Sequence, residues 1–145
     1  MLKEIIHKKK LYALIIKESH QNKKGVSFFT KNNANQQIGF MHHPKNYDIK
    51  PHKHQKRETK IFITSEVIIL QKGKLRVDFY DTKKKYLFSV IIKKNQIIML
   101  VHGGHGFKVL EPVKMLEIKQ GPFVSNKDKT KFDKIDEKKI KIKKI

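Results

Sequence analysis

Three histidines and a glutamate stand out because their side chains are common ligands of divalent metal ions. His52 and His54 lie two residues apart, so on an extended strand both imidazoles would point to the same face. Glu66 opens a long apolar run, and His105 lies in a glycine-rich turn after another apolar run. Imidazole and carboxylate groups bind Fe, Mn, Ni, Zn or Cu without selecting among them. We therefore expect one divalent first-row metal ion if the two segments meet.

The spacing of these residues resembles the two motifs of the cupin superfamily. The first motif has a glycine, His-x-His, a glutamate and, after six residues, a second glycine. Glu66 and Gly73 reproduce that last interval, while Asn46 stands at the place of the opening glycine. The second motif ends in a turn with a histidine, which His105 matches. The resemblance covers residues 46–107 and implies that the three histidines and the glutamate hold the metal.

Two glutamates compete for the acidic ligand position. Glu58 lies at the family's usual distance after His54, whereas eleven residues separate His54 from Glu66. We favour Glu66 because it heads an apolar strand and keeps the interval to Gly73, while Glu58 lies in a polar connection. Glu58 and His102 are then candidates for a catalytic general base. His102 also competes with His105 as a metal ligand, although the motif favours His105. It is otherwise a residue at the pocket rim or behind the ligands, or an exposed turn residue.

Arg76 and Tyr80 are candidates for substrate binding. They share a strand face with Asp78, opposite to the apolar residues of the same strand. If that face looks into a barrel, Arg76 could clamp a carboxylate or phosphate of a ligand. The alternative is an exposed arginine beside Asp78.

The fold predicted from the sequence is all-β. Short runs rich in β-branched and aromatic residues alternate with Gly, Pro, Asn and Lys turns, without helical periodicity. Such spacing is typical of an antiparallel sandwich or barrel, and the resemblance implies a double-sheet jelly roll, the cupin-type β-barrel. The expected strands are 11–17, 25–30, 36–43, 47–54, 60–71, 74–81, 86–93, 96–101, 105–110 and 113–120.

The composition divides the chain into a domain and a tail. Residues 1–123 carry the predicted strands, and residues 124–145 form a Lys-rich C-terminal tail that we expect to be frayed. The net charge is +21, but 32 of the 34 basic residues are lysines spread along the whole chain. Surfaces that bind phosphate usually also contain arginine, whose guanidinium group forms two hydrogen bonds to one phosphate. Because this chain has almost none, we predict no nucleic-acid partner.

The absence of cysteine excludes disulfides and thiolate metal sites. No apolar run approaches the length of a membrane span, and the N-terminus lacks the apolar core of a signal peptide, so a cytoplasmic location without membrane association is expected. An exposed edge strand is expected to support a homodimer by sheet extension.

The resemblance implies two functions. One is a metal-dependent enzyme, such as an isomerase or epimerase, acting on a sugar or nucleotide-sugar derivative. The other is a non-catalytic module that binds a small ligand or metal for sensing. A catalytic metal keeps an open position in a concave pocket, whereas protein ligands saturate a structural metal.

Overall fold

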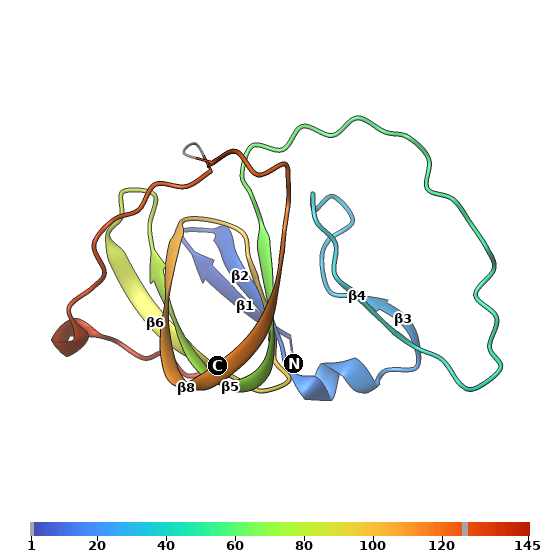
Figure 1. The fold of residues 1–145 in the computed structure, drawn as a ribbon, viewed down its shortest axis with the longest axis horizontal. Helices are drawn as coiled ribbons and strands as arrows, with labels where there is room; N and C mark the ends of the chain where they lie inside the picture. The colour runs from blue at the N-terminus through green and yellow to red at the C-terminus, as the bar shows by residue number, and fades with distance from the viewer. Residues whose placement is uncertain (1, 126–127) are drawn as a thin grey trace.

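A computed structural model describes residues 2–125 and 128–145, and these residues form a curved antiparallel sheet with two segments packed on it (Figure 1). The strands are β1 (Lys3–His7), β2 (Lys10–Ile16), β3 (Gly25–Phe28), β4 (Gly39–His42), β5 (Glu66–Tyr80), β6 (Tyr86–Lys93), β7 (Ile97–Leu100) and β8 (Gly104–Lys119). Two short 3₁₀ helices, η1 (Glu18–Asn22) and η3 (Glu137–Lys139), complete the described elements.

The long strand β5 organises the sheet. Along one side it pairs with β8 over its whole length, from Glu66 opposite Lys119 to Tyr80 opposite Gly104. On the other side it pairs first with β7 and then with β6, and β2 and β1 extend the sheet beyond β7. β3 and β4 form a separate hairpin. The predicted antiparallel β class is confirmed, but the described residues form no closed barrel.

A bend at Gly73 lets β5 change partners. Gly73 has φ +84°, and a Cβ atom there would lie 2.1 Å from the carbonyl oxygen of Pro112 on β8. The β5–β8 register shifts at three points between Leu70 and Leu75. Glycine alone tolerates both this φ and this close approach. The sequence predicted a turn between two strands here, whereas the structure has one bent strand, and β8 likewise joins the two strands predicted over 105–120.

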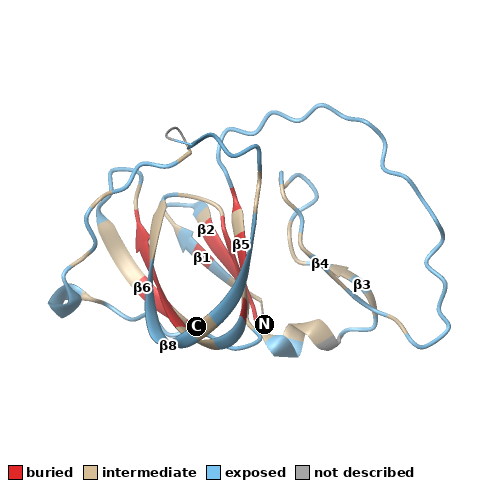
Figure 2. Cartoon of the chain, in the orientation of Figure 1, coloured by how far each residue is buried: buried red, intermediate tan, exposed pale blue. Residues whose placement is uncertain are grey.

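The two faces of the sheet bury different residues. On β5, Leu75, Val77 and Phe79 point to the inner face and belong to the main core, each with no exposed surface. The members of that core come from β1, β2, β5, β6 and β7 (Figure 2). A second, smaller cluster of Leu14, Val67 and Met99 lies on the outer face. The alternation predicted for β5 is therefore confirmed.

Two segments pack on the sheet, largely on its outer face, and Ile145 at the end of the second segment also contacts the main core. Residues 20–42, which we call the hairpin cover, place Phe29 and Ile38 against the smaller cluster. Residues 128–145, the C-terminal cover, run along β5 and β6, where Lys141 and Lys143 exchange backbone hydrogen bonds with Ser89. The expectation of a frayed tail is wrong for these residues, because their backbone and side chains find partners on the sheet. Residues 126 and 127 lie outside the described chain.

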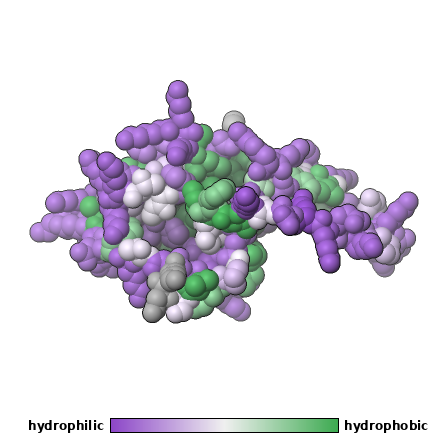
Figure 3. Space-filling view, turned by 90° about the horizontal axis from the view of Figure 1, so that it is seen from above, coloured by the Kyte–Doolittle hydropathy of each residue, from purple (hydrophilic) through white to green (hydrophobic). Residues whose placement is uncertain are grey.

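Between β4 and β5 the chain leaves the sheet in a wide arc, the arm (residues 44–64), which is exposed throughout (Figure 1). The strand predicted over 47–54 is wrong, since no strand forms there. In the view of Figure 3, hydrophilic side chains lie across most of the surface and apolar ones gather near its middle. No helix among the described residues is long and apolar enough to cross a membrane.

Candidate functional site

Glu66 and His105, two of the predicted metal ligands, lie in contact. Glu66 begins β5 beside Leu100, the last residue of β7, and the short β7–β8 turn then returns the chain to His105. His105 Nε2 lies 2.9 Å from Glu66 Oε2, and both side chains are partly buried. Glu66 alternates with the inner residue Ile68, and His105 lies opposite the inner residue Phe79, so both belong to the inner face.

The surroundings keep the Glu66 carboxyl ionised. The hydrogen bond from His105 lowers the pKa of Glu66, and this outweighs the opposing effect of burial. Lys119, opposite Glu66 on β8, adds a smaller lowering and is itself paired with Asp128. The arrangement therefore presents a carboxylate and an imidazole side by side, a pair that could bind a cation or exchange a proton.

The remaining predicted ligands lie elsewhere. His52 and His54 are on the exposed arm, with their rings in edge-to-face contact at 5.4 Å and His52 Nδ1 3.0 Å from the carbonyl oxygen of Lys50. Glu58 is also on the arm. Across residues 2–125 and 128–145, no three metal-ligating side chains converge. The structure thus joins Glu66 to His105 and leaves the two arm histidines apart, and the metal site stays a prediction.

Arg76 is held by the chain's own carboxylates. It is buried on the outer face, where its Nε lies 2.8 Å from Asp78 Oδ1 and its Nη1 lies 2.6 Å from Glu137 Oε2 in the C-terminal cover. Ser89 donates a further hydrogen bond to Asp78. These contacts raise the pKa of Arg76 and lower that of Glu137. The predicted clamp for a ligand anion is filled by Asp78 and Glu137.

Tyr80 is covered in the same way. Its hydroxyl accepts a hydrogen bond from the backbone N–H of Ile135 at 3.0 Å, and its ring meets Phe132 edge-on at 5.0 Å. Burial raises the pKa of Tyr80. A substrate could reach Arg76 and Tyr80 only if the C-terminal cover moved, and their predicted role in substrate binding is untested.

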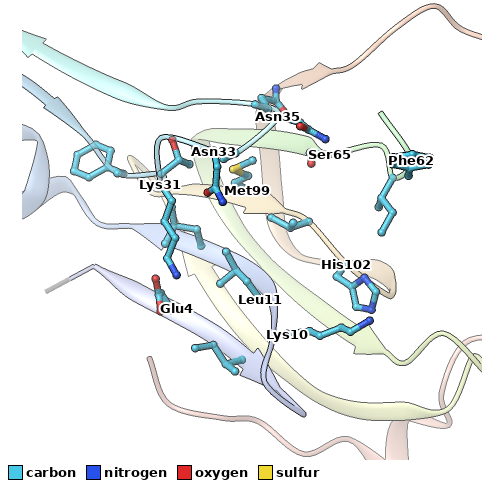
Figure 4. A pocket seen from close by; sticks show the side chains of 18 of the residues that line it. Glu4, Lys10, Leu11, Lys31, Asn33, Asn35, Phe62, Ser65, Met99 and His102 are labelled. Carbon is cyan, nitrogen blue, oxygen red and sulfur yellow. The ribbon is translucent and has the colours of Figure 1, made fainter. Parts of the chain in front are cut away.

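The structure adds a cavity that the sequence did not indicate. It has a volume of about 590 Å³ and lies between the outer face of β1, β2 and β7, the hairpin cover and the end of the arm (Figure 4). Its apolar lining consists of Ile6, Leu11, Leu14, Phe29, Ala34, Phe62, Ile63, Met99 and Val101. Its polar lining consists of Glu4, Lys9, Lys10, Thr30, Lys31, Asn33, Asn35, Gln36, Ser65 and His102. Among the predicted site residues, His102 alone lines it.

Two features of the cavity concern its polar groups. The side-chain oxygen of Gln36 is buried and has no hydrogen-bond partner among the described residues. At another part of the wall, Lys10 extends toward the partly buried His102 ring, which meets the Tyr12 ring edge-on at 5.1 Å (Figure 4). Burial and the nearby Lys10 charge both lower the pKa of His102. This cavity contains none of the predicted metal ligands, so the predicted role of His102 beside a metal site stays a prediction.

One signal in the sequence could have pointed to the cavity. Phe62 and Ile63 form an apolar pair at the end of an otherwise polar arm, and both contribute to the cavity wall. Comparison of the chain with protein-family models, curated proteins and solved structures found no match. The geometry of the described residues is therefore the basis on which we infer a function.

Proposed function

We propose that the chain is a small-molecule binding module whose ligand occupies the cavity beneath the hairpin cover. The observation that carries the proposal is the cavity itself, and one of its lining residues, Gln36, has a buried side-chain oxygen without a partner among the described residues. A buried acceptor without a donor costs about 1–3 kcal/mol. A ligand that donates a hydrogen bond to this oxygen, once the Gln36 side chain turns into the cavity, would recover that cost, so binding and stability are linked.

The size and chemistry of the cavity support the same proposal. Its volume of about 590 Å³ falls within the range that accommodates small ligands. The buried residues Leu14 and Met99 provide an apolar floor, and polar groups gather at its margins. Apolar walls supply binding energy, while a few fixed polar groups orient the ligand.

Methionine methyl groups offer a direct test. Met99 lies in the cavity, whereas Met115 lies on the exposed strand β8 and serves as an internal control. With ¹³C-methyl methionine, we expect compounds from a library of small water-soluble molecules to move the Met99 resonance in a saturable way. The Met115 resonance should stay in place. A library that leaves Met99 unmoved, or moves both equally, would contradict the proposal.

A metal-dependent enzyme acting on a sugar or nucleotide-sugar derivative is the second candidate. The contact that favours it is the 2.9 Å pair of Glu66 and His105, which offers one carboxylate and one imidazole on the inner face. A divalent ion would need further ligands, and His52 and His54 could supply them only if the arm folded back. The position of Glu66 and His105 is also what supports a relationship to the cupin jelly roll. A bound ion would supply Lewis-acid chemistry for a carbonyl or hydroxyl substrate.

Calorimetric titration with Mn²⁺, Fe²⁺, Ni²⁺ and Zn²⁺ tests this second candidate. We expect one of the ions to bind with 1:1 stoichiometry, and Glu66→Gln, His105→Gln and His52→Gln to abolish the heat. Glu58→Gln is the matched control and should bind as the wild type does. Loss of binding in Glu58→Gln instead would move the acidic ligand from Glu66 to Glu58.

The expected homodimer also stays a proposal, with β8 as the candidate edge. Among the described strands β8 pairs with β5 alone. It exposes six large apolar side chains, Phe107, Val109, Leu110, Met115, Leu116 and Ile118. A long apolar edge of this kind is a template for pairing with another strand.

Sedimentation velocity at raised salt, which screens the +21 charge of each copy, should then show a dimer. Leu116→Lys is expected to give a monomer. Phe62→Lys, at an apolar residue on the arm that is 88% exposed, is the control and should leave the dimer intact. A wild-type chain that sediments as a monomer at every concentration would remove the proposal.

A further inference from the structure

One part of the cavity wall carries the positive charge of Lys10, and this charge indicates the class of ligand that the cavity would bind. Lys10 has no carboxylate partner among the ion pairs of residues 2–125 and 128–145. Other strand lysines, such as Lys108 and Lys114, also lack one among these residues, so what distinguishes Lys10 is its position at the cavity. The ammonium group of Lys10 instead points toward another potential cation, His102 (Figure 4).

The remainder of the wall separates this cationic part from a group of amides. Leu11 and Met99 lie between the Lys10–His102 pair and the loop that carries Asn33 and Asn35 (Figure 4). The unpartnered acceptor Gln36 follows Asn35 directly in that loop. A ligand that spans the cavity therefore meets the Lys10 charge, then apolar side chains, then a loop that carries amide groups and Lys31.

We propose that the cavity binds an elongated amphiphilic anion. Its anionic group lies between Lys10 and His102, its apolar body lies on Leu11 and Met99, and a hydrogen-bond donor near its other end reaches Gln36. This assignment rests on the proposed function, because it names the class of molecule that the module would bind. A hydrogen bond between an anion and the Lys10 ammonium joins two charged groups, and such bonds are stronger than those between neutral groups.

Decanoate, decanol and decyltrimethylammonium test the charge preference, because they share a ten-carbon chain and differ in the head group. With the full-length protein we expect decanoate to move the Met99 methyl resonance at the lowest concentration. Decanol should bind about tenfold more weakly, and the cation should not bind, since a hydrogen bond to a charged group contributes about 1.5–3 kcal/mol. Equal affinity for decanoate and decanol would overturn the anion assignment while leaving small-molecule binding in place.

Two charge-matched variants separate a site from general attraction to a basic protein. Lys10→Met should weaken decanoate binding about tenfold. Lys56→Met removes the same charge from the exposed arm, outside the cavity lining, and should leave decanoate binding within twofold of the wild type. Equal weakening in both variants, or none in Lys10→Met, would overturn the proposal.

The His102 ring provides an independent readout. It faces the Lys10 ammonium and the Tyr12 ring, and both burial and Lys10 lower its pKa. Bound decanoate should raise the pKa of His102, followed by its ¹³C and ¹H ring shifts, whereas decanol should not. For the amide end, 10-hydroxydecanoate should bind more tightly than decanoate, and Gln36→Leu should remove that advantage.

A decanoate complex in which the pKa of His102 is unchanged would place the anion elsewhere and overturn the assignment. If none of the three ten-carbon compounds moves Met99, the assignment fails, while a response of Met99 to other molecules in the library would still support the binding module. If the whole library fails as well, the proposed function fails with it.

Discussion

The two segments that cover the sheet differ in whether the buried polar groups near them have hydrogen-bond partners. Under the C-terminal cover, Arg76 is bonded by both Asp78 and Glu137, and the Tyr80 hydroxyl accepts a hydrogen bond from the backbone. Within the hairpin cover, three buried side-chain atoms lack partners among the described residues, on His20, Ser27 and Gln36. These three are the unsatisfied buried side-chain atoms in the described part of the chain. We infer that the first cover is structural and that the second leaves room for a ligand.

Residue type alone would assign ligand binding to Arg76 and Tyr80 and no function to Gln36, whereas their hydrogen bonds indicate the opposite. An arginine and a tyrosine on one strand face resemble a ligand clamp, yet Arg76 and Tyr80 are occupied by the chain itself. Gln36 carries no motif in the sequence, yet its side-chain oxygen is buried without a partner. A functional group is recognised by whether its hydrogen bonds are satisfied, which depends on what packs against it.

The largest expected effect is on the C-terminal cover. Asp78→Ala removes one partner of Arg76, and both residues are more than 90% buried. Breaking a buried ion pair leaves an uncompensated charge, so we expect the free energy of unfolding to fall by about 3 kcal/mol. Urea unfolding followed by circular dichroism measures the change.

Asp48→Ala on the exposed arm is the matched control and should change stability by less than about 0.5 kcal/mol. If the two variants unfold at the same urea concentration, the network around Arg76 does not stabilise the fold. The inference that the C-terminal cover is structural would then be wrong.

A change of opposite sign is expected under the hairpin cover. Gln36→Leu replaces an unsatisfied acceptor by an apolar side chain, so the ligand-free protein should become more stable by about 1 kcal/mol. Its neighbour Gln37 donates hydrogen bonds to the carbonyl oxygens of Lys31 and Asn32, and Gln37→Leu should give no gain. Thermal unfolding compares the two. A loss of stability in Gln36→Leu would mean that Gln36 already has a partner.

The smallest effect concerns pH. Arg76 lowers the pKa of Glu137 below its ordinary value of 4.5, so the folded state holds this carboxyl ionised more strongly than the unfolded state does. The resulting stability is present above the unfolded pKa and is lost as the pH falls through the lowered, folded pKa. Glu137→Gln should therefore flatten the acid side of the stability profile.

Urea midpoints measured between about pH 6 and pH 3 check this prediction, since the carboxyl titrates in that range. Glu58→Gln on the arm is the control and should keep the wild-type profile. An acid side that is equally steep in Glu137→Gln would show that Glu137 is not held by Arg76 in solution.

Local patterns were sufficient for several elements of the fold. The apolar runs predicted β2, β6 and β7 to within a few residues, and alternation along Leu75, Val77 and Phe79 identified the inner face of β5. The motif resemblance placed Glu66 and His105 together, and their side chains lie in contact, while their role as metal ligands stays a prediction. The resemblance also predicted that His52 and His54 would join them. That prediction needed a strand to point both imidazoles to one face, and the arm forms no strand.

The sequence by itself determined the antiparallel β character, the alternation of buried side chains and the absence of thiol chemistry, because each follows from residue type and spacing along a short stretch. Tertiary structure decided that Arg76 and Tyr80 are covered and that Gln36 lines a cavity. Those outcomes depend on where residues 128–145 and 20–42 pack, many residues away from the strands they cover. Spacing fixes the direction of a side chain, whereas only the packed chain decides whether that side chain meets a partner.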